Sequence, residues 1–228
     1  MLSEPRTISL LCEIVHIPMK HSLDALRDVY ARVCSTCGYE NFIRTPAGAR
    51  VERHQEQSGG FSHLTFTGDR LQFTDDHIGL TVDQFAEKVA AVLGVAVPRL
   101  RIPVILAQQV TVRLIVTPTA HMSAEEFLGQ KLFRVAPGDL ERLGRPAHLF
   151  GLRLMAPATQ LELQTYNVRV EAYMRDRRSL YLENVGTFKV PIATQSLATV
   201  GNQIEATSHF LVERVVPFLS LFDGRESP

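Results

Sequence analysis

Hydrophobic and polar positions along the chain follow two periods, one of two residues and one of three to four. In residues 7–16 every second side chain is apolar, which predicts a strand. From Leu23 to Val33 apolar residues recur every three or four positions, and we expect one face of a helix that ends before Gly38.

Three short alternating runs follow at residues 49–54, 61–67 and 70–74, separated by glycine-containing breaks, and they predict a meander of two or three strands. Thr81-Val82-Asp83-Gln84 has the pattern of a capping box, because the threonine can accept from the third amide while the glutamine reaches back. A second helix is expected from here to near Gly94.

The same order of elements recurs in the second half of the chain. The expected elements are a strand over residues 110–116, a helix opened by the capping box Ser123–Glu126, strands over 149–155, 165–174 and 179–183, and a long helix over 197–219. At an offset of 102 residues, the apolar positions of the first strand fall on those of residues 110–116.

This recurrence predicts an α+β protein with two similar β-α-β(2-3)-α halves that share an antiparallel sheet with helices on one face. The first half covers residues 1–94 and the second covers residues 107–228, including the long C-terminal helix. Residues 95–106 contain two prolines in an apolar context and predict a packed connection between the halves.

Composition narrows the class of protein. The 228 residues are 45% hydrophobic, enough for a substantial core, and Lys plus Arg equals Asp plus Glu at 24 each. Such neutrality disfavours a nucleic-acid-binding protein, whose affinity comes mainly from cations. The N-terminus lacks the features of a signal peptide, no run approaches the roughly 20 apolar residues of a membrane span, and three cysteines indicate reduced thiols. We therefore expect a cytoplasmic protein without a membrane partner.

Polar side chains on the predicted second-half strands suggest a binding surface. Alternation places Arg169, Glu171 and Tyr173 opposite the core-facing side chains of residues 165–174, and Arg153 lies on the preceding strand. Guanidinium groups bind carboxylates and phosphates through paired hydrogen bonds. We predict that these four residues bind a protein partner or a small acidic ligand, with no cofactor and no metal, and self-association stays open.

Two tripeptides offer an enzymatic alternative. His63-Leu64-Thr65 and His121-Met122-Ser123 resemble the paired motifs of the two-histidine phosphoesterases. That resemblance implies one histidine as general base and one as general acid in the cleavage of 2′,5′ or cyclic phosphodiesters, with Thr65 and Ser123 holding phosphate oxygens. The simpler interpretation makes His63 a solvent-facing strand residue and Ser123 a helix cap.

Two further features of the sequence suggest other functions. Cys34-Ser35-Thr36-Cys37 is a lone pair of cysteines at the C-terminal end of a predicted helix, where the helix dipole opposes thiolate formation, so redox or metal use is disfavoured. The order of elements also resembles that of the TATA-box-binding protein, a duplicated saddle that binds nucleic acid. The neutral charge argues against this second alternative.

Two short motifs resemble a sporadically distributed family of uncharacterised bacterial proteins. They are Gly151-Leu152-Arg153 in a second-half strand and Cys12-Glu13-Ile14 in the opening strand. The resemblance implies a bacterial source and the same layout, and it implies no activity. With the usual catalytic motifs missing from the sequence, we favour a non-catalytic binding protein whose partner the sequence does not identify.

Overall fold

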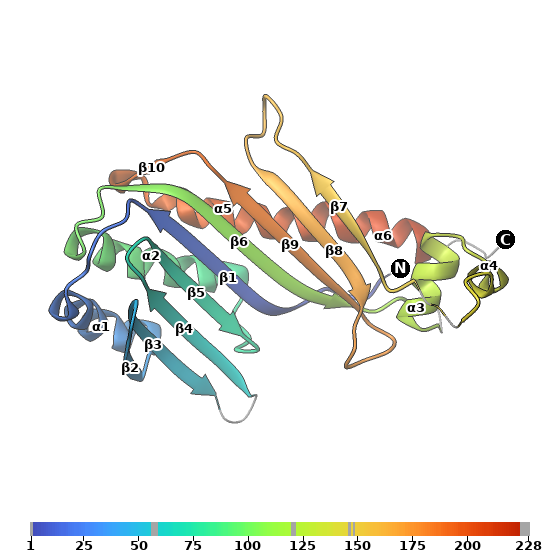
Figure 1. Ribbon diagram of the computed structural model, residues 1–228, viewed down its shortest axis with the longest axis horizontal. Helices are drawn as coiled ribbons and strands as arrows, with labels where there is room; N and C mark the ends of the chain where they lie inside the picture. Colours follow the sequence, from blue (N-terminus) through green and yellow to red (C-terminus); the bar gives the residue numbers. More distant parts are fainter. Residues whose placement is uncertain (1, 56–58, 120–121, 146, 148, 224–228) are drawn as a thin grey trace.

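The computed structural model describes residues 2–55, 59–119, 122–145, 147 and 149–223, which form one large antiparallel sheet with helices (Figure 1). The α+β class is therefore confirmed. The described strands are β1 (Arg6–His16), β2 (Asn41–Thr45), β3 (Gly48–Gln55), β4 (Gly60–Phe66), β5 (Arg70–Asp76), β6 (Val104–Val116), β7 (Gly151–Ala156), β8 (Thr165–Ala172), β9 (Leu180–Phe188) and β10 (Ile192–Ala193).

The helical segments alternate with the groups of strands. They are α1 (Leu23–Cys37), α2 (Val82–Arg99), α3 (Ala124–Glu126) with the π-helical segment η1 (Phe127–Leu132), α4 (Pro137–Glu141), the 3₁₀ turn η2 (Thr194–Ser196), α5 (Ala198–His209), the π-helical segment η3 (Phe210–Val215) and α6 (Val216–Asp223).

One strand pair lies at the centre of the sheet. The strand order is β2-β3-β4-β5-β1-β6-β9-β8-β7, and β10 pairs with β6. β1 and β6 pair antiparallel, with Leu10 opposite Val112 and Cys12 opposite Val110. The strands of the first meander extend the sheet on the β1 side, and those of the second extend it on the β6 side.

The helices cover a single face of this sheet. On β1, Leu10, Cys12 and Ile14 are buried, whereas Leu11 and Glu13 between them are only partly buried. α2 contacts β1, α5 contacts β6 and β9, and the two helices contact each other, so they form a layer behind the sheet in the view of Figure 1. The hydrophobic core therefore lies between the helices and one set of alternating strand positions.

Both predicted capping boxes are present. Thr81 Oγ1 accepts from the Gln84 amide at 3.2 Å while the Gln84 side chain accepts from the Thr81 amide at 3.0 Å. Ser123 and Glu126 make the same reciprocal pair at 3.1 and 2.7 Å. Each pair satisfies amides that have no partner within the helix, so the sequence located these two helix starts correctly.

The second helix extends beyond its predicted end. α2 continues through Gly94 to Arg99, so the predicted connection over residues 95–106 shrinks to residues 100–103 between α2 and β6. Ala96 and Val97 are buried and continue the apolar stripe of the helix. Pro98 is tolerated in the final turn, where the loss of one amide hydrogen bond and the clash with the preceding turn disturb little of the helix.

The sheet is also larger than the sequence predicted. The sequence does not predict β2. Phe42 is the one apolar side chain of this edge strand that packs against the core, so the strand lacks a clear alternation of apolar and polar residues. β9 was expected to end at Glu183 but continues through Gly186 to Phe188. A Cβ atom at Gly186 would lie 2.4 Å from Thr207 Oγ1, so glycine allows α5 to approach this strand closely.

The predicted final helix is present but changes its winding. α5, η3 and α6 follow each other without a break, with a π-helical segment in the middle. Pro217 lacks the amide hydrogen needed for an ordinary helical bond at the start of α6. The carbonyl of Thr207 accepts from Asn184 Nδ2 at 2.8 Å, which ties this helix to β9. The altered hydrogen bonding therefore coincides with a proline and with a contact from the sheet.

Two glycines test where the helices end. We expect Gly94→Ala to raise the free energy of unfolding by about 0.5–1 kcal/mol, because alanine is favoured inside a helix and a Cβ there meets nothing within 4 Å. Gly38→Ala, the matched variant, should lower it by about 1 kcal/mol, because Gly38 has a φ of 70° after the end of α1. Urea denaturation measures both, and a loss of stability in Gly94→Ala would contradict a helix that continues to Arg99.

Candidate binding face of the sheet

The face of the sheet opposite the helices, called the open face from here on, carries the predicted binding residues. Val168, Val170 and Ala172 of β8 are buried against the helices, as predicted. The alternate residues of β8 therefore point the other way. On β6 to β9, the polar and aromatic residues of the open face that matter below are Arg113, Tyr181, Glu183, Arg169, Glu171 and Arg153.

Strand register aligns four of these side chains in a row across the sheet. Arg153 on β7 lies opposite Arg169 on β8, Arg169 lies opposite Glu183 on β9, and Glu183 lies opposite Arg113 on β6. Residues directly opposite each other project from the same face with their Cβ atoms about 5 Å apart. The carboxylate of Glu183 consequently lies between two arginines.

Glu183 is the centre of a hydrogen-bonded network. Its Oε2 accepts from Arg113 Nε at 2.7 Å and from the Tyr181 hydroxyl at 2.9 Å. Burial alone would raise the pKa of Glu183, but these hydrogen bonds and the neighbouring arginines hold it below its ordinary value. The pKa of Tyr181 is raised, first by burial and then by the Glu183 carboxylate. At neutral pH this carboxylate is therefore charged and already paired.

Arg169 connects the network to Glu171 and to two aromatic rings. Its Nε lies 3.5 Å from carboxylate oxygens of both Glu171 and Glu183, and its Nη2 donates to the Tyr181 hydroxyl at 3.3 Å. The guanidinium lies 5.1 Å from the centre of the Tyr181 ring. The rings of Tyr173 and Tyr181 are stacked, with their centres 6.5 Å apart. These contacts fix the orientation of Arg169.

Arg153 differs from the other two arginines in having no ion-pair partner among the residues that the structure describes. It is exposed and lies on β7, the last strand of the sheet on this side. Its neighbour Gly151 explains part of the Gly-Leu-Arg motif, because a Cβ there would lie 2.6 Å from Glu171 Cγ. Glycine at this position lets the Glu171 side chain lie across β7.

The structure thus places all four predicted binding residues in one region, with Arg153, Arg169 and Glu171 on adjacent strands and Tyr173 directly after β8. Sequence reasoning missed Arg113, Tyr181 and Glu183, which hold Arg169 in place. Alternation assigns each of them to a strand face, but only the pairing of β6, β9 and β8 brings them together.

Positive charge predominates in this region. The strands β6 to β9 on the open face and the turn between β8 and β9 carry six arginines against three acidic residues, namely Arg113, Arg153, Arg169, Arg175, Arg177 and Arg178 against Glu171, Asp176 and Glu183. Since the whole chain is neutral, this excess is a local feature of the second half.

His63 lies on the open face of the first half. It pairs with Glu52 on β3 and Thr74 on β5, and its ring stacks on Phe61 at 5.5 Å. Its Nδ1 is buried without a hydrogen-bond partner among the described residues. The pKa of His63 is lowered, first by burial and then by the nearby Arg50. Thr65, two residues along β4, shares this face.

Ser123 is not brought together with His63 and Thr65. Its hydroxyl caps α3, and the adjacent Ala124 amide donates to the Arg177 carbonyl at 2.8 Å, at the turn that precedes β9. β9 and β4 are separated by β6, β1 and β5, which corresponds to about 19 Å at the usual spacing of strands. His121 lies outside the described residues. The capping role proposed for Ser123 is therefore the one observed.

The thiols of Cys12 and Cys37 are not activated. Cys12, Cys34 and Cys37 are free, and burial raises the pKa of both Cys12 and Cys37. A reactive cysteine needs the opposite shift, because the thiolate is the nucleophile. Among the described residues there is no group of three or more His, Cys, Asp or Glu side chains placed to hold a metal ion. No helix in the described part of the chain has the length and apolar character that a membrane crossing requires.

The lowered pKa of His63 predicts a pH dependence of stability. As pH falls through the ordinary value of 6.5 towards the lower pKa of the folded state, the unfolded chain takes up a proton first, and the free energy of unfolding decreases. We expect His63→Gln to lose less stability than the natural protein between about pH 7.5 and pH 5.5. Urea denaturation at the two pH values measures this difference, and equal losses would show that His63 titrates alike in both states.

No protein-family model matches this chain, and none of the curated proteins matches it. Among solved structures, it is similar to E. coli aspartokinase III in complex with aspartate and ADP in the R-state, with a TM-score of 0.21 and 13% sequence identity. The similarity covers 90% of this chain and 32% of that chain, so this chain spans about a third of the aspartokinase. A similarity this low supports no conclusion about fold or function.

Proposed function

We propose that the protein is a non-catalytic binding protein whose open face, at the β7 edge, binds an extended acidic segment of a partner protein. The observation that carries this proposal is the exposed guanidinium of Arg153, which lies beside the preordered Arg169 and has no ion-pair partner among the described residues. An acidic side chain placed against Arg153 would pair with it and offset the repulsion between Arg153 and the directly opposite Arg169.

The position of β7 supports an extended partner. β7 pairs with β8 and is the terminal strand of the described sheet, so no described strand bonds to its outer edge. An added strand can satisfy such backbone groups and place every second side chain on the open face. Met155, also on β7, is 69% exposed and offers apolar contact beside the arginine. The edge therefore provides backbone pairing, and Arg153 provides selectivity for acidic residues.

The charge distribution supports a protein partner over nucleic acid. Carboxylates of Glu13, Glu52, Glu171 and Glu183 lie among the arginines of the same sheet face and interrupt the row of cations that a phosphate backbone would follow. The phosphoesterase alternative lacks support from geometry because Ser123 and Thr65 are far apart. A protein segment can place its acidic residues opposite the arginines alone.

We also infer that the two halves are copies of one unit and share the layout of the bacterial family that the sequence resembles. The strand order supports a duplication. Going outward from the central pair, the strands follow as β1-β5-β4-β3 in the first half and as β6-β9-β8-β7 in the second, so each central strand has the last strand of its own meander as its neighbour. The sequence offset of 102 residues places Leu10 directly opposite its counterpart Val112. Such a pair would lie on the axis that relates the two halves.

The binding proposal is tested with a synthetic peptide that alternates Glu and Thr over eight residues. We expect this fluorescent peptide to bind in anisotropy titrations at low salt, and Arg153→Glu to weaken binding at least about tenfold because an attraction becomes a repulsion. Arg153 is the informative position, since Arg169→Glu would add a third carboxylate beside Glu171 and Glu183 and would destabilise the fold.

Arg27→Glu serves as the matched control, because Arg27 is an exposed arginine on α1, on the helical side of the first half. It should bind the acidic peptide as the natural protein does. A peptide that alternates Lys and Thr should not bind. Equal affinity of the Lys peptide, or unchanged binding of the acidic peptide by Arg153→Glu, would refute the proposal, whereas displacement by free glutamate at similar concentration would indicate a small acidic ligand instead.

A further inference from the structure

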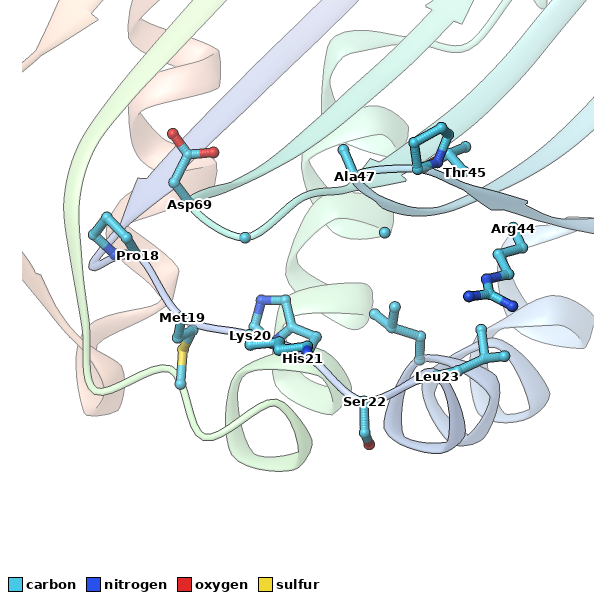
Figure 2. A pocket seen from close by; sticks show the side chains of 14 residues that line it. Pro18, Met19, Lys20, His21, Ser22, Leu23, Arg44, Thr45, Ala47 and Asp69 are labelled. Atoms are coloured by element: carbon cyan, nitrogen blue, oxygen red, sulfur yellow. The ribbon is translucent and has the colours of Figure 1, made fainter.

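A pocket of about 840 Å³ lies at the other end of the molecule, where the loops of the first half meet (Figure 2). One wall is the segment between β1 and α1, a second is the hairpin between β2 and β3, and the floor is the turn at Gly68 and Asp69. This volume is within the range of small-molecule sites in proteins. None of the residues predicted from the sequence to bind a ligand lines this pocket.

Backbone contacts hold the walls in place. The Met19 amide donates to the Gly68 carbonyl at 2.7 Å, and the His16 amide donates to the Asp69 carbonyl at 2.9 Å. A Cβ at Gly48 would lie 2.2 Å from the Phe66 carbonyl oxygen, so the hairpin packs directly against β4. The pocket is therefore formed by segments that are fixed to each other, and a ligand would not have to order them.

Two cationic side chains and a histidine line the pocket, and the pKa of that histidine, His21, is lowered, first by burial and then by the neighbouring His16. Lys20 and His21 belong to the segment before α1, and Arg44 belongs to β2, as Figure 2 shows. No hydrogen bond or ion pair joins any of the three to another described residue. The one acidic residue of the lining, Asp69, is already engaged, because Arg70 Nη2 donates to it at 2.8 Å and Thr67 Oγ1 at 3.0 Å. These bonds lower the pKa of Asp69. The pocket consequently favours an anion.

Two histidines beside the pocket have unsatisfied ring nitrogens. His16 is fully buried, and the centre of its ring lies 5.5 Å from the centre of the His21 ring. The Nε2 atoms of both rings are shielded from solvent and have no hydrogen-bond partner among the described residues. Unpaired buried polar atoms are uncommon because each loses its bonds to water on folding. Of the two, His21 lines the pocket, so its unsatisfied Nε2 is an independent sign of a polar ligand there.

Apolar side chains complete the lining. Leu26 is buried, Leu23 and Met19 are half-buried, and Pro18 and Pro46 lie at the rim. These surfaces can contact the carbon skeleton of a ligand while the basic groups contact its charge. Inorganic anions would use only the second kind of contact, so the lining favours an organic anion.

From this arrangement we propose that the pocket binds a small organic anion, with a carboxylate or phosphate held by Arg44 and the Lys20–His21 segment and an apolar body against Met19, Leu23 and Leu26. This function is independent of the β7 edge, because the two sites lie on opposite halves of the sheet. It would make the protein a sensor or carrier of such a compound as well as a binding partner.

The test uses phenyl phosphate and benzoate as probes, with inorganic phosphate and benzyl alcohol as partial ligands. In ¹⁵N-resolved NMR titrations, we expect saturable shifts of the amides of Lys20, His21, Gly48 and Gly68 with at least one of the two charged aromatic probes. The stronger of the two identifies phosphate or carboxylate as the preferred group. Inorganic phosphate and benzyl alcohol should each bind more weakly, because each makes only one kind of contact.

Arg44→Glu should weaken the binding of the charged probe at least about tenfold. Arg44 is exposed on an edge strand, so the variant should fold, and its melting temperature checks this. The matched control is Arg142→Glu, an exposed arginine next to α4 at the far end of the molecule in Figure 1, which should leave binding unchanged. The proposal is overturned if neither charged probe shifts these amides, if benzyl alcohol binds as well as they do, or if Arg44→Glu binds as tightly as the natural protein.

Discussion

The antiparallel pairing of β1 with β6 is the interaction on which the rest of this structure depends. It extends from Arg6 opposite Ile115 to His16 opposite Ile105 and joins two meanders into one sheet. Because paired residues project from the same face, the apolar sides of both strands point the same way. All the larger helices can then pack on that side as one layer, and the cores of the two halves merge. The same geometry leaves the other face of the sheet without a helical cover.

An uncovered sheet face must satisfy its own polar groups, and here it does so by pairing charges across strands. Glu183 is bonded to Arg113 and Tyr181, and on the other half Glu13 is bonded to Arg70 and Gln72. Paired charges on a partly exposed surface contribute little to stability, but they fix side-chain positions. A face with its central charges fixed and, at its edge, an arginine that no described residue pairs is suited to recognition.

The two proposed sites follow from different parts of the same architecture. The β7 edge exists because an open sheet must end, and its outermost strand has backbone groups that no described strand satisfies. The cationic pocket exists because three connections of the first half, β1–α1, β2–β3 and β4–β5, converge at one end of their strands, and backbone hydrogen bonds fix the first to the last. Loops positioned on a rigid sheet are where binding residues are commonly found.

The sequence by itself determined what depends on neighbouring residues. The alternation in β1 and β8 assigned side chains to faces, and the capping boxes at Thr81 and Ser123 located two helix starts, because both signals arise within a few residues. Local signals failed where packing decided the outcome: α2 continues through Gly94, and β2 forms by pairing with β3. Only the tertiary structure set the register that places Arg169 opposite Glu183, and only it brought Lys20, His21 and Arg44 around one pocket. Those arrangements depend on contacts between residues far apart in the chain, which no local period encodes.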